Sequence, residues 1–389
     1  MPGNALTRAR RKVGIGLAVF VSLGATWAVL PGLPVLRAPS ARAEERAAGR
    51  ELFVHDWQAH DPLAHGDGLG PVFNGTSCGS CHFQGGVGGG GSNDHNVLAF
   101  EAHPTKARPD VKAGLVHKFA IADAFVESTG TLRPFFPIVK GGTRTVSGCS
   151  VVINDFDPVK TESVNTSALF GAGWLDRISG KTIVQQYHKR AIKRIGREVV
   201  GDFNGVGPGR PRVLPDGRLG KFGWKAQFAT LEEFVAAACA NEIGLGNPRM
   251  EQAKPLVLAA YPKVKPDLDS GQFRSLVAYV DTLPRPAQVL PASISGRDEA
   301  ERGKALFGQI GCAECHTPDV GGVEGVYSDF LLHRLEDPRQ GNGGGYRPAE
   351  IQEVPLPEDH PLPEEWKTPP LWGVASSAPY FHDGKASTL

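Results

Sequence analysis

The sequence lacks an excess of charge of either sign. Its 42 Lys and Arg residues nearly balance 41 Asp and Glu residues, and the formal net charge is +1 at pH 7. Proteins that bind nucleic acid need a basic face for the phosphates, and this composition provides neither a basic face nor an acidic tail. We therefore expect no nucleic-acid partner. Methionine is also scarce, since only Met1 and Met250 occur.

Cysteine is too scarce for a disulfide scaffold. Six cysteines occur in 389 residues, whereas disulfide-stabilised domains are short and dense in cysteine. Four of the six fall in two Cys-x-x-Cys-His motifs, at 78–82 and 312–316. The remaining two, Cys149 and Cys239, either pair in an oxidising compartment or stay reduced in the interior, and we favour buried free thiols.

The Cys-x-x-Cys-His motif is the attachment signal of c-type haem. Its two thiols add to the porphyrin vinyl groups, and its histidine ligates the iron. A zinc site would need a second ligand pair at short range, and neither motif is followed by one. We predict two covalently bound haem c groups. The attachment residues are Cys78, Cys81, His82, Cys312, Cys315 and His316, and His82 and His316 are the axial iron ligands.

The N-terminus has the pattern of an export signal. Four basic residues between positions 8 and 12 precede an apolar run of 18 residues, Val13 to Leu30, and Ala41-Arg42-Ala43 offers a cleavage site. We predict a signal peptide over residues 1–43 and a periplasmic protein, because haem is attached covalently outside the bacterial inner membrane. If the run is not cleaved, it is long enough to remain as a membrane anchor.

The chain contains an internal duplication. Ala43–Phe53 and Asp298–Phe307 share the ending Gly-Arg/Lys-x-Leu-Phe, and each leads to a haem motif. Two further blocks repeat. Asn165–Gly171 matches Lys367–Gly373, and Phe222-Gly223-Trp224 onward to Leu231 parallels Phe381-His382-Asp383 onward to Leu389. We predict an N-terminal haem domain over residues 44–285, a proline-rich linker over 286–296, and a C-terminal haem domain over 297–389.

The hydrophobic spacing predicts a mainly α protein with two cytochrome c-like helical domains and long irregular loops. Helical patterns cover 43–53, 183–195, 231–243, 273–283 and 298–307. We interpret residues 97–160 as irregular with a short hairpin, and the glycine run Gly85–Gly91 as a linker rather than a close approach of backbone to the haem. The second copy ends at Leu389, where its equivalent of the 231–243 helix should begin. We expect a missing last helix and an uncovered apolar face on 302–308.

These blocks together resemble the bacterial di-haem oxidoreductase family, often labelled thiol oxidoreductases. That family is similar to di-haem cytochrome c peroxidases and to the di-haem enzyme that matures tryptophan tryptophylquinone. The residues that carry the resemblance are 68–74 leading into the first motif, 165–173, 222–226, 327–333, 366–373 and 380–384. The resemblance implies two haem domains whose haems face each other across an interface.

The resemblance also implies a position for the sixth iron ligand. In this family a Met or His usually lies seven residues beyond the Thr-Leu of the last block. In the first copy that position is Ala238, which cannot bind iron; in the second it falls beyond Leu389. We therefore expect an open distal face at the N-terminal haem, and electron entry at the C-terminal haem.

Several side chains are candidates for a role at the haems. His333 and His382 are candidate iron ligands or proton donors, the alternative being hydrogen bonds to propionate or backbone. His95 would reach the distal face of the first haem or be a solvated loop residue. Trp224 and Trp174 are candidate electron-hopping residues or core aromatics. Met250 is a weaker candidate ligand, because its surroundings are those of a loop.

The function predicted from these features is a periplasmic di-haem oxidoreductase of peroxidase type. A small redox protein or a small-molecule donor would reduce the C-terminal haem, and the N-terminal haem would reduce peroxide or a related small oxidant. The alternatives are a non-catalytic electron-transfer cytochrome and a thiol or sulfur oxidoreductase. The membrane is a partner only if the N-terminal apolar segment is retained.

Overall fold

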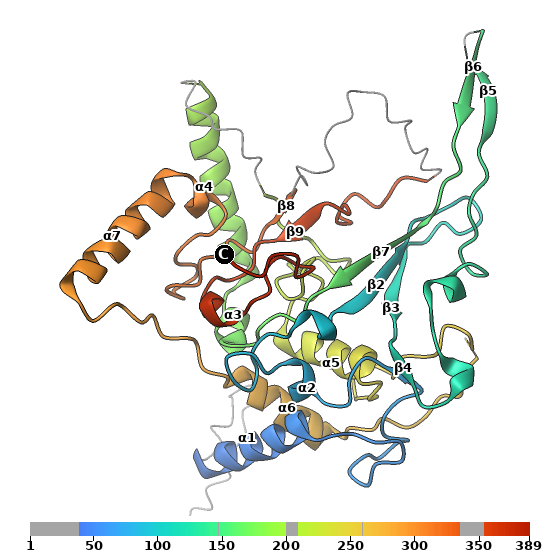
Figure 1. Cartoon of the computed structure of the whole chain (residues 1–389), viewed down its shortest axis with the longest axis horizontal. Coiled ribbons are helices and arrows are strands. Elements are labelled where there is room, and N and C mark those ends of the chain that lie inside the picture. The colour runs from blue at the N-terminus through green and yellow to red at the C-terminus, as the bar shows by residue number, and fades with distance from the viewer. Residues whose placement is uncertain (1–38, 147, 200–208, 259, 335–353) are drawn as a thin grey trace, which may run out of the picture. The chain divides into compact units, whose positions relative to one another are not determined.

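The computed structural model of the chain describes residues 39–389, apart from 147, 200–208, 259 and 335–353 (Figure 1). Residues 40–389 form one unit. Most of the predicted signal peptide, including its apolar run, lies outside the described residues. Among the described residues, no helix is both long and apolar enough to cross a membrane.

The long helices form where the hydrophobic spacing predicts them. They are α1 (Pro39–Val54), α4 (Gly180–Val199), α5 (Leu231–Glu242), α6 (Ser270–Asp281) and α7 (Ile294–Gln309). Capping boxes start α5 and α6: Thr230 pairs reciprocally with Glu233, and Asp269 with Gln272. Each box satisfies backbone N–H groups that would otherwise lack partners at the helix start.

Short helices and turns account for the remaining helical segments. They are α2 (Cys78–Cys81), α3 (Ala172–Asp176), η1 (Asn93–His95), η2 (Asp123–Phe125), η3 (Thr129–Leu132), η4 (Cys312–Glu314) and η5 (Val374–Ser376). Both Cys-x-x-Cys segments belong to this group.

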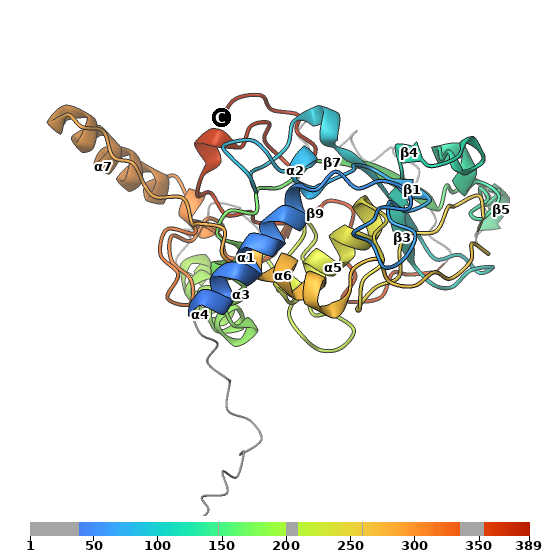
Figure 2. The same ribbon diagram turned by 90° about the horizontal axis from the view of Figure 1, so that it is seen from below.

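The first haem motif lies against a core formed by α1, α5 and α6 (Figures 1 and 2). Phe53 of α1 is 1 % exposed, and the ring of Tyr279 from α6 meets it edge-on at 5.3 Å between centroids. The two helices approach closely because Gly49 faces Ser275, where any Cβ would lie 1.9 Å from the serine carbonyl oxygen. Cys78 packs against the same core.

The prediction of a mainly α fold is wrong. The described residues contain one three-stranded sheet, ordered β3-β2-β7, and three two-stranded sheets. The strands of the larger sheet are β2 (Val97–Ala102), β3 (Lys112–Val116) and β7 (Val159–Val164). The others are β1 (Val72–Phe73) with β4 (Phe119–Ala120), β5 (Gly142–Val146) with β6 (Cys149–Ile153), and β8 (Leu332–Arg334) with β9 (Glu365–Lys367).

The three-stranded sheet was missed in the sequence analysis because one of its faces packs in a small separate core and the other carries acidic residues that bind distant histidines. One face carries Phe100 and Val116, which pack with Leu132 in a small separate core. The opposite face carries Glu101 and Glu162, which share a face because Ala99 pairs with Glu162 in the antiparallel register. Acidic residues on a strand normally indicate a solvated face, but here the C-terminal part of the chain contacts them, as described below.

Of the two cysteines outside the haem motifs, the structure describes the side chain of Cys239 alone. Cys239 is a free thiol, 1 % exposed in α5, and burial raises its pKa well above the ordinary value. The prediction of a buried free thiol is therefore confirmed for Cys239. The Cys149 side chain lies outside the described residues.

The second half of the chain shares a core with the first. Ile178, which lies between α3 and α4, and Ile183 in the first turn of α4 pack with Val320, Val326 and other apolar residues of the loop that follows the second motif. The predicted boundary between a domain over 44–285 and a domain over 297–389 stays a prediction, because this core contains residues from both ranges.

Helix α7 has the sequence pattern of α1 but not its packing. No residue of α7 is buried; Leu306 is 52 % exposed and Ile310 is 64 % exposed. Gly303 corresponds to Gly49 of the first copy, yet a Cβ on Gly303 would meet no atom within 4 Å. The apolar face expected to be uncovered at 302–308 is therefore open in the structure (Figures 1 and 2).

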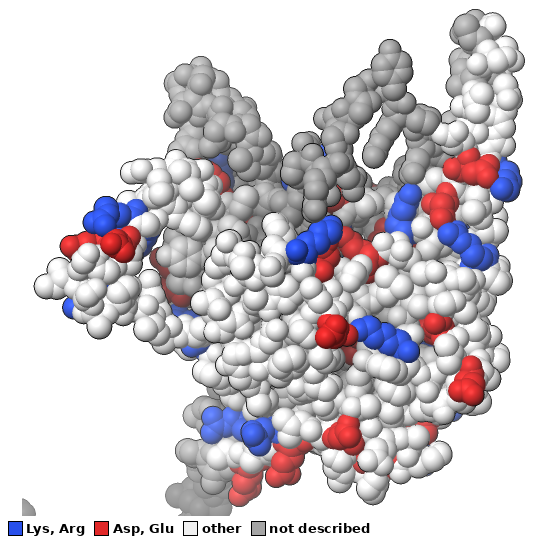
Figure 3. All heavy atoms as spheres, in the orientation of Figure 1, with Lys and Arg blue, Asp and Glu red and all other residues white. Residues whose placement is uncertain are grey.

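Charged side chains are mixed over the surface. On the face shown in Figure 3, Lys and Arg lie among Asp and Glu, with no broad area of one sign. Several of these charges are paired, such as Arg133 with Asp157 at 2.6 Å. Such exposed pairs contribute little to stability, about 0–1 kcal/mol each.

The paired glycines of α1 and α7 give a matched test of the packing. We expect Gly49→Ala to lower the free energy of unfolding by about 1–3 kcal/mol, because the added methyl overpacks the contact with α6. Gly303→Ala should instead raise it by up to about 1 kcal/mol, since alanine favours an exposed helix. Urea denaturation of both variants checks this, and a neutral or stabilising Gly49→Ala would contradict the close helix contact.

Candidate functional site

The first Cys-x-x-Cys segment is a single helical turn, α2. Its N-cap is Ser77, whose side-chain oxygen accepts the backbone N–H of Ser80 at 3.0 Å. One turn of helix places positions i and i+3 on the same face. Cys78 and Cys81 are therefore presented on one side, and both are free thiols.

His82 is held by a loop carbonyl. Its Nδ1 lies 3.0 Å from the carbonyl oxygen of Gly89, so Nδ1 carries the proton and Nε2 keeps its lone pair. Burial lowers the pKa of His82 to about 4, and bonds to the carbonyls of Gly89 and Ser167 offset this only in part. The imidazole is therefore neutral at pH 7, which is the form that ligates a metal. The Phe53 ring lies 6.3 Å away between centroids.

The glycine run after the first motif makes close backbone contacts, so its interpretation as a linker is wrong. Gly88 has a φ of +89°, and a Cβ on Gly89 would lie 1.7 Å from the Gln84 carbonyl oxygen. A Cβ on Gly91 would lie 2.6 Å from the Cys81 carbonyl oxygen. The run folds back tightly on the motif and so brings the Gly89 carbonyl to His82.

The second motif repeats this arrangement. Cys312 and Cys315, in and after the turn η4, are free thiols. The Nδ1 of His316 lies 2.9 Å from the carbonyl oxygen of Tyr327. The ring of Phe307 from α7 lies 6.4 Å from His316, at a tilt of 55° that resembles the 47° tilt of Phe53 to His82.

Both motifs therefore have the features that a c-type haem needs. Each presents two thiols from one turn and a histidine whose Nδ1–H is bonded to a backbone carbonyl, which leaves Nε2 for the iron. A hydrogen bond of this kind fixes the tautomer and the orientation of a metal-ligating imidazole. No group of three or more His, Cys, Asp or Glu side chains that could hold a bare metal ion occurs in the described part of the chain.

The second repeated block has the same backbone conformation in both copies. Gly171 precedes α3 with φ +72° and ψ 11°, and Gly373 precedes η5 with φ +69° and ψ 6°. These left-handed values favour glycine. A Cβ on Gly171 would also lie 2.7 Å from the Trp372 ring, so the two copies of the block touch each other.

The third block is also repeated, but its predicted alignment is wrong by one residue at its start. Short antiparallel bridges join Phe222 to Phe228 in one copy and Tyr380 to Ala386 in the other. Phe222 therefore corresponds to Tyr380 rather than to Phe381. In this register Trp224 corresponds to His382, which agrees with the spacing of the Thr-Leu pairs at the ends of the blocks.

The two copies hold each other through reciprocal hydrogen bonds. The N–H of Asn165 donates to the carbonyl of His382 at 2.6 Å, and the N–H of Lys367 donates to the carbonyl of Trp224 at 2.9 Å. Each bond joins the second block of one copy to the third block of the other. Equivalent residues therefore make equivalent contacts, as in a two-fold arrangement.

Three aromatic rings meet at this junction. His382 stacks on Trp366 at 3.5 Å and 8°, and lies 6.5 Å edge-on from Trp224. The ammonium of Lys225 lies 3.6 Å from the centre of the Trp366 ring, and burial lowers the pKa of Lys225 to about 8. Trp174, in contrast, is 44 % exposed and lies beside arginine side chains.

Carboxylates of the three-stranded sheet anchor this junction. Glu162 lies 2.8 Å from Nε2 of His382, and Glu101 lies 2.9 Å from Nε2 of His360. Burial would raise the pKa of Glu101, but its bonds to His103 and His360 outweigh burial and lower it to about 2. The strands inserted after the first motif thus position His382, one of the candidate histidines.

The other candidate side chains fall in different places. His95 lies in η1, with Nδ1 2.9 Å from the Ser92 hydroxyl and its ring 5.2 Å edge-on from Phe83. The Nδ1 of His333 lies 3.5 Å from the sulfur of Cys315, beside the second motif. Met250 is 36 % exposed, and its sulfur lies 3.9 Å from the Asn241 amide nitrogen.

Helix α5 places Glu242, a residue that the sequence analysis did not identify, beside the first motif. Ala238 is partly exposed, although both of its neighbours in sequence are buried, so it faces open space. Glu242 lies one turn further along the same face. Its carboxylate accepts the side-chain amide of Asn74 at 2.9 Å, and its charge raises the pKa of the Cys81 thiol, although burial of that thiol is the larger cause.

The environment of Glu242 favours its protonated form. Burial raises its pKa, and the bond from Asn74 and the nearby His117 and Lys118 offset this only in part. His117 itself lies 2.9 Å from Glu127. The signal in the sequence was weak, because Asn74 and Glu242 are 168 residues apart and only the fold brings them together.

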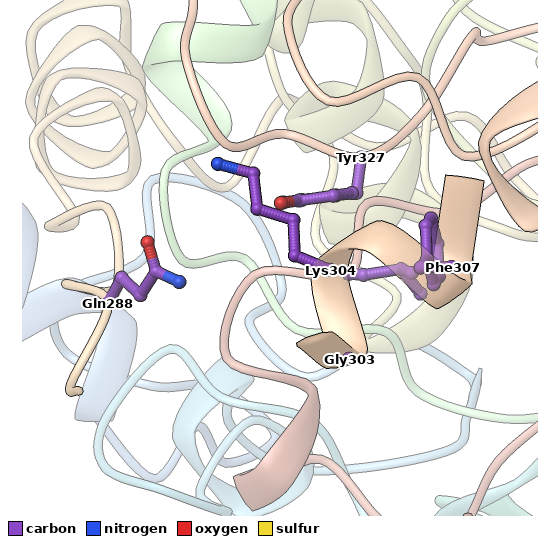
Figure 4. Close-up of a pocket in the computed structure, with 6 residues that line it drawn as sticks. Gln288, Gly303, Lys304, Phe307 and Tyr327 are labelled. Carbon is purple, nitrogen blue, oxygen red and sulfur yellow. The ribbon is translucent and has the colours of Figure 1, made fainter. Parts of the chain in front are cut away.

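A hollow of about 300 Å³ lies beside the second motif. It is lined by Phe307 and Lys304 of α7, by Tyr327 and Leu371, and by Gln288 of the preceding segment. Figure 4 shows Lys304 extending past the Tyr327 hydroxyl, with Gln288 on the opposite side. The ring of Tyr327 meets Phe307 edge-on at 5.7 Å, as Tyr279 meets Phe53 at the first motif.

Comparison with known proteins gives limited similarity. No protein-family model matches the sequence. The gamma subunit of hydrazine synthase from Kuenenia stuttgartiensis is 28 % identical over 137 residues, which is 30 % of this chain and 39 % of the relative. The chain thus matches well under half the length of that relative. A solved structure of Kuenenia stuttgartiensis hydrazine synthase pressurized with xenon covers 59 % of this chain and 62 % of its own, at 17 % identity and a TM-score of 0.29.

Proposed function

We propose that the chain is an exported di-haem c-type oxidoreductase with peroxidase-like activity. The observation that carries the proposal is the repeated motif geometry. In both copies two thiols stand on one turn, and the histidine Nδ1 lies 2.9–3.0 Å from a loop carbonyl. The similarity to an enzyme subunit, hydrazine synthase gamma, is consistent with a catalytic role. Under this proposal the protein belongs to the di-haem oxidoreductase family that its sequence blocks resemble.

Each proposed haem is held by one motif. Cys78 and Cys81 attach the first haem and His82 ligates its iron; Cys312, Cys315 and His316 do the same for the second. When bound, the two groups supply redox-active iron that can exchange single electrons and bind a small oxidant. Ala238 provides no ligand on the partly exposed face of α5 beside the first motif, and we propose that the oxidant binds there.

The junction of the two copies gives a reason to expect electron exchange between them. Trp224, His382 and Trp366 bring aromatic rings to the place where the copies exchange hydrogen bonds. Trp224 is fixed by its Nε1–H, which donates to the Asn165 carbonyl at 2.8 Å. We propose that electrons from a small redox protein or a small-molecule donor enter at the second motif and cross this junction to the first.

Reduction of a peroxide also needs a proton. The O–O bond breaks readily only if the leaving oxygen is protonated, and a positioned acid accelerates such a step by about 10²–10⁴-fold. Glu242 is half-buried beside the first motif, and burial raises its pKa, so we propose that its carboxyl group supplies this proton. Asn74 orients the carboxyl group through its amide.

A second candidate substrate is a small inorganic nitrogen compound. It is favoured by the similarity to hydrazine synthase subunit gamma, whose name refers to the synthesis of such a compound. The same open face and the same proton donor would serve this chemistry. Steady-state turnover with peroxide and with hydrazine, using one electron donor, distinguishes the two substrates.

The amount of covalently bound haem should depend on each pair of motif cysteines separately. We expect Cys78→Ser/Cys81→Ser and Cys312→Ser/Cys315→Ser each to halve the covalently bound haem of the exported protein, because each pair holds one group. Mass spectrometry and the reduced pyridine haemochrome spectrum measure the loading. Cys239→Ser is the control, since this buried thiol lies outside the motifs. Full loading after removal of either pair would contradict the proposal.

Glu242→Gln should slow reduction of the oxidant without loss of haem. Glutamine keeps an oxygen for the Asn74 amide but cannot transfer a proton, so we expect the reaction with peroxide to slow by about 10²–10⁴-fold. Stopped-flow absorbance of the first haem measures this rate. The matched control is Glu232→Gln in the exposed first turn of the same helix, which should react like the unsubstituted protein. A Glu242→Gln protein that reacts at the unsubstituted rate would remove Glu242 from the mechanism.

A further inference from the structure

His333 is fixed against the second haem motif by two hydrogen bonds. Its Nε2 lies 2.9 Å from Oδ2 of Asp329, and its Nδ1 lies 3.5 Å from the sulfur of Cys315. The His333 side chain is 12 % exposed and that of Asp329 is 3 % exposed. The two ring nitrogens therefore point at a carboxylate on one side and at a haem-attachment sulfur on the other.

The site around His333 is built for an imidazole. A Cβ on Gly209 would lie 2.4 Å from Nε2 of His333, so only glycine allows the backbone to pass this close to the ring. Asp329 is fixed in turn: its Oδ1 accepts the N–H of Leu331 at 3.0 Å, and its Oδ2 accepts Nη1 of Arg190 at 2.8 Å. The ring has little freedom to turn away from Cys315.

These contacts determine the protonation of His333 once haem is attached. Attachment converts the Cys315 thiol into a thioether, which has no proton and can only accept a hydrogen bond. The carboxylate of Asp329 is also an acceptor. An imidazole can donate to acceptors at both of its nitrogens only when each carries a proton, and it is then a cation. With Cys315 as the free thiol of this structure, burial lowers the pKa of His333, but the bonds to Asp329 and Cys315 outweigh burial and raise this pKa to about 9.

At the first motif no cation of the described residues is hydrogen-bonded to the attachment sulfur, and the opposite charges of Glu242 and Lys118 both act on it. The corresponding sulfur, of Cys81, has the neutral hydroxyl of Ser80 at 3.8 Å. The other charged groups near His333 are Asp329, Arg190 of α4 and the buried Lys367 of β9, which interacts with Asp329. The two otherwise similar motifs thus differ in the charge at the attachment sulfur.

We propose that His333 is a positioning residue that holds a positive charge against the thioether of the second haem and raises the reduction potential of that haem. The inference rests on the proposed function, because it requires a haem at 312–316. Reduction adds one electron to the haem, and a nearby fixed cation in a partly buried site stabilises the reduced form. The residue thereby favours electron uptake at the second motif.

The test is a spectroelectrochemical titration of the fully loaded protein at pH 7. His333→Gln removes the charge and keeps a polar side chain, and we expect it to lower the midpoint potential of the second haem while the first is unchanged. His333→Lys replaces the imidazolium with another cation and should restore much of the potential. The matched control is His360→Gln, which breaks a different histidine–carboxylate pair, that of His360 with Glu101, and should shift neither haem.

The outcomes separate this inference from the proposed function. Haem loading is measured first, and the Cys312→Ser/Cys315→Ser protein identifies which redox wave belongs to the second haem. If no wave depends on these cysteines, both the proposed function and the inference fail. If the wave is present and His333→Gln leaves its midpoint unchanged, or shifts both haems equally, only the role of His333 is overturned.

Discussion

The hydrogen bond from each motif histidine to a loop carbonyl is the constraint on which both proposed haem sites depend. It sets the tautomer of His82 and of His316 and points Nε2 away from the backbone. The carbonyls come from segments that fold back over the motifs, through the glycine run at the first site and the loop ending at Tyr327 at the second. These two glycine-containing connections are therefore part of the sites rather than spacers.

The second constraint is the reciprocal contact between the repeated blocks. Because Asn165 bonds to the His382 carbonyl and Lys367 bonds to the Trp224 carbonyl, neither copy completes its surroundings alone. The inserted sheet strengthens the contact through Glu162 and Glu101, which bind histidines of the C-terminal part. Under the proposed function, electrons cross from one half of the chain to the other through this contact.

The copies also differ, and the differences give them separate roles under the proposed function. The first motif has an alanine at the expected ligand position and a half-buried carboxyl group, Glu242, one turn further along α5. The second motif has His333 within hydrogen-bond distance of the sulfur of Cys315. The first therefore has what substrate reduction needs, an open face and a proton, and the second has a charge that favours accepting electrons.

The sequence alone was sufficient for the haem motifs, the five long helices and the repeats. These features depend on short spacings, such as the three residues from Cys78 to Cys81 or the helical period of α6. The sheet was missed because Glu101 and Glu162 resemble solvated positions until the C-terminal histidines are placed on them. Glu242 was missed because its partner is Asn74, 168 residues away, and periodicity carries no information over such a distance.

Low-temperature electron spin resonance of the oxidised, haem-loaded protein, before and after addition of cyanide, shows whether the first haem has an open face. We predict a high-spin signal that is assigned to the first motif by its loss in Cys78→Ser/Cys81→Ser, and that converts to low spin when cyanide binds. Two low-spin signals of the oxidised protein that do not respond to cyanide or peroxide would contradict an open first haem and would make the chain an electron carrier.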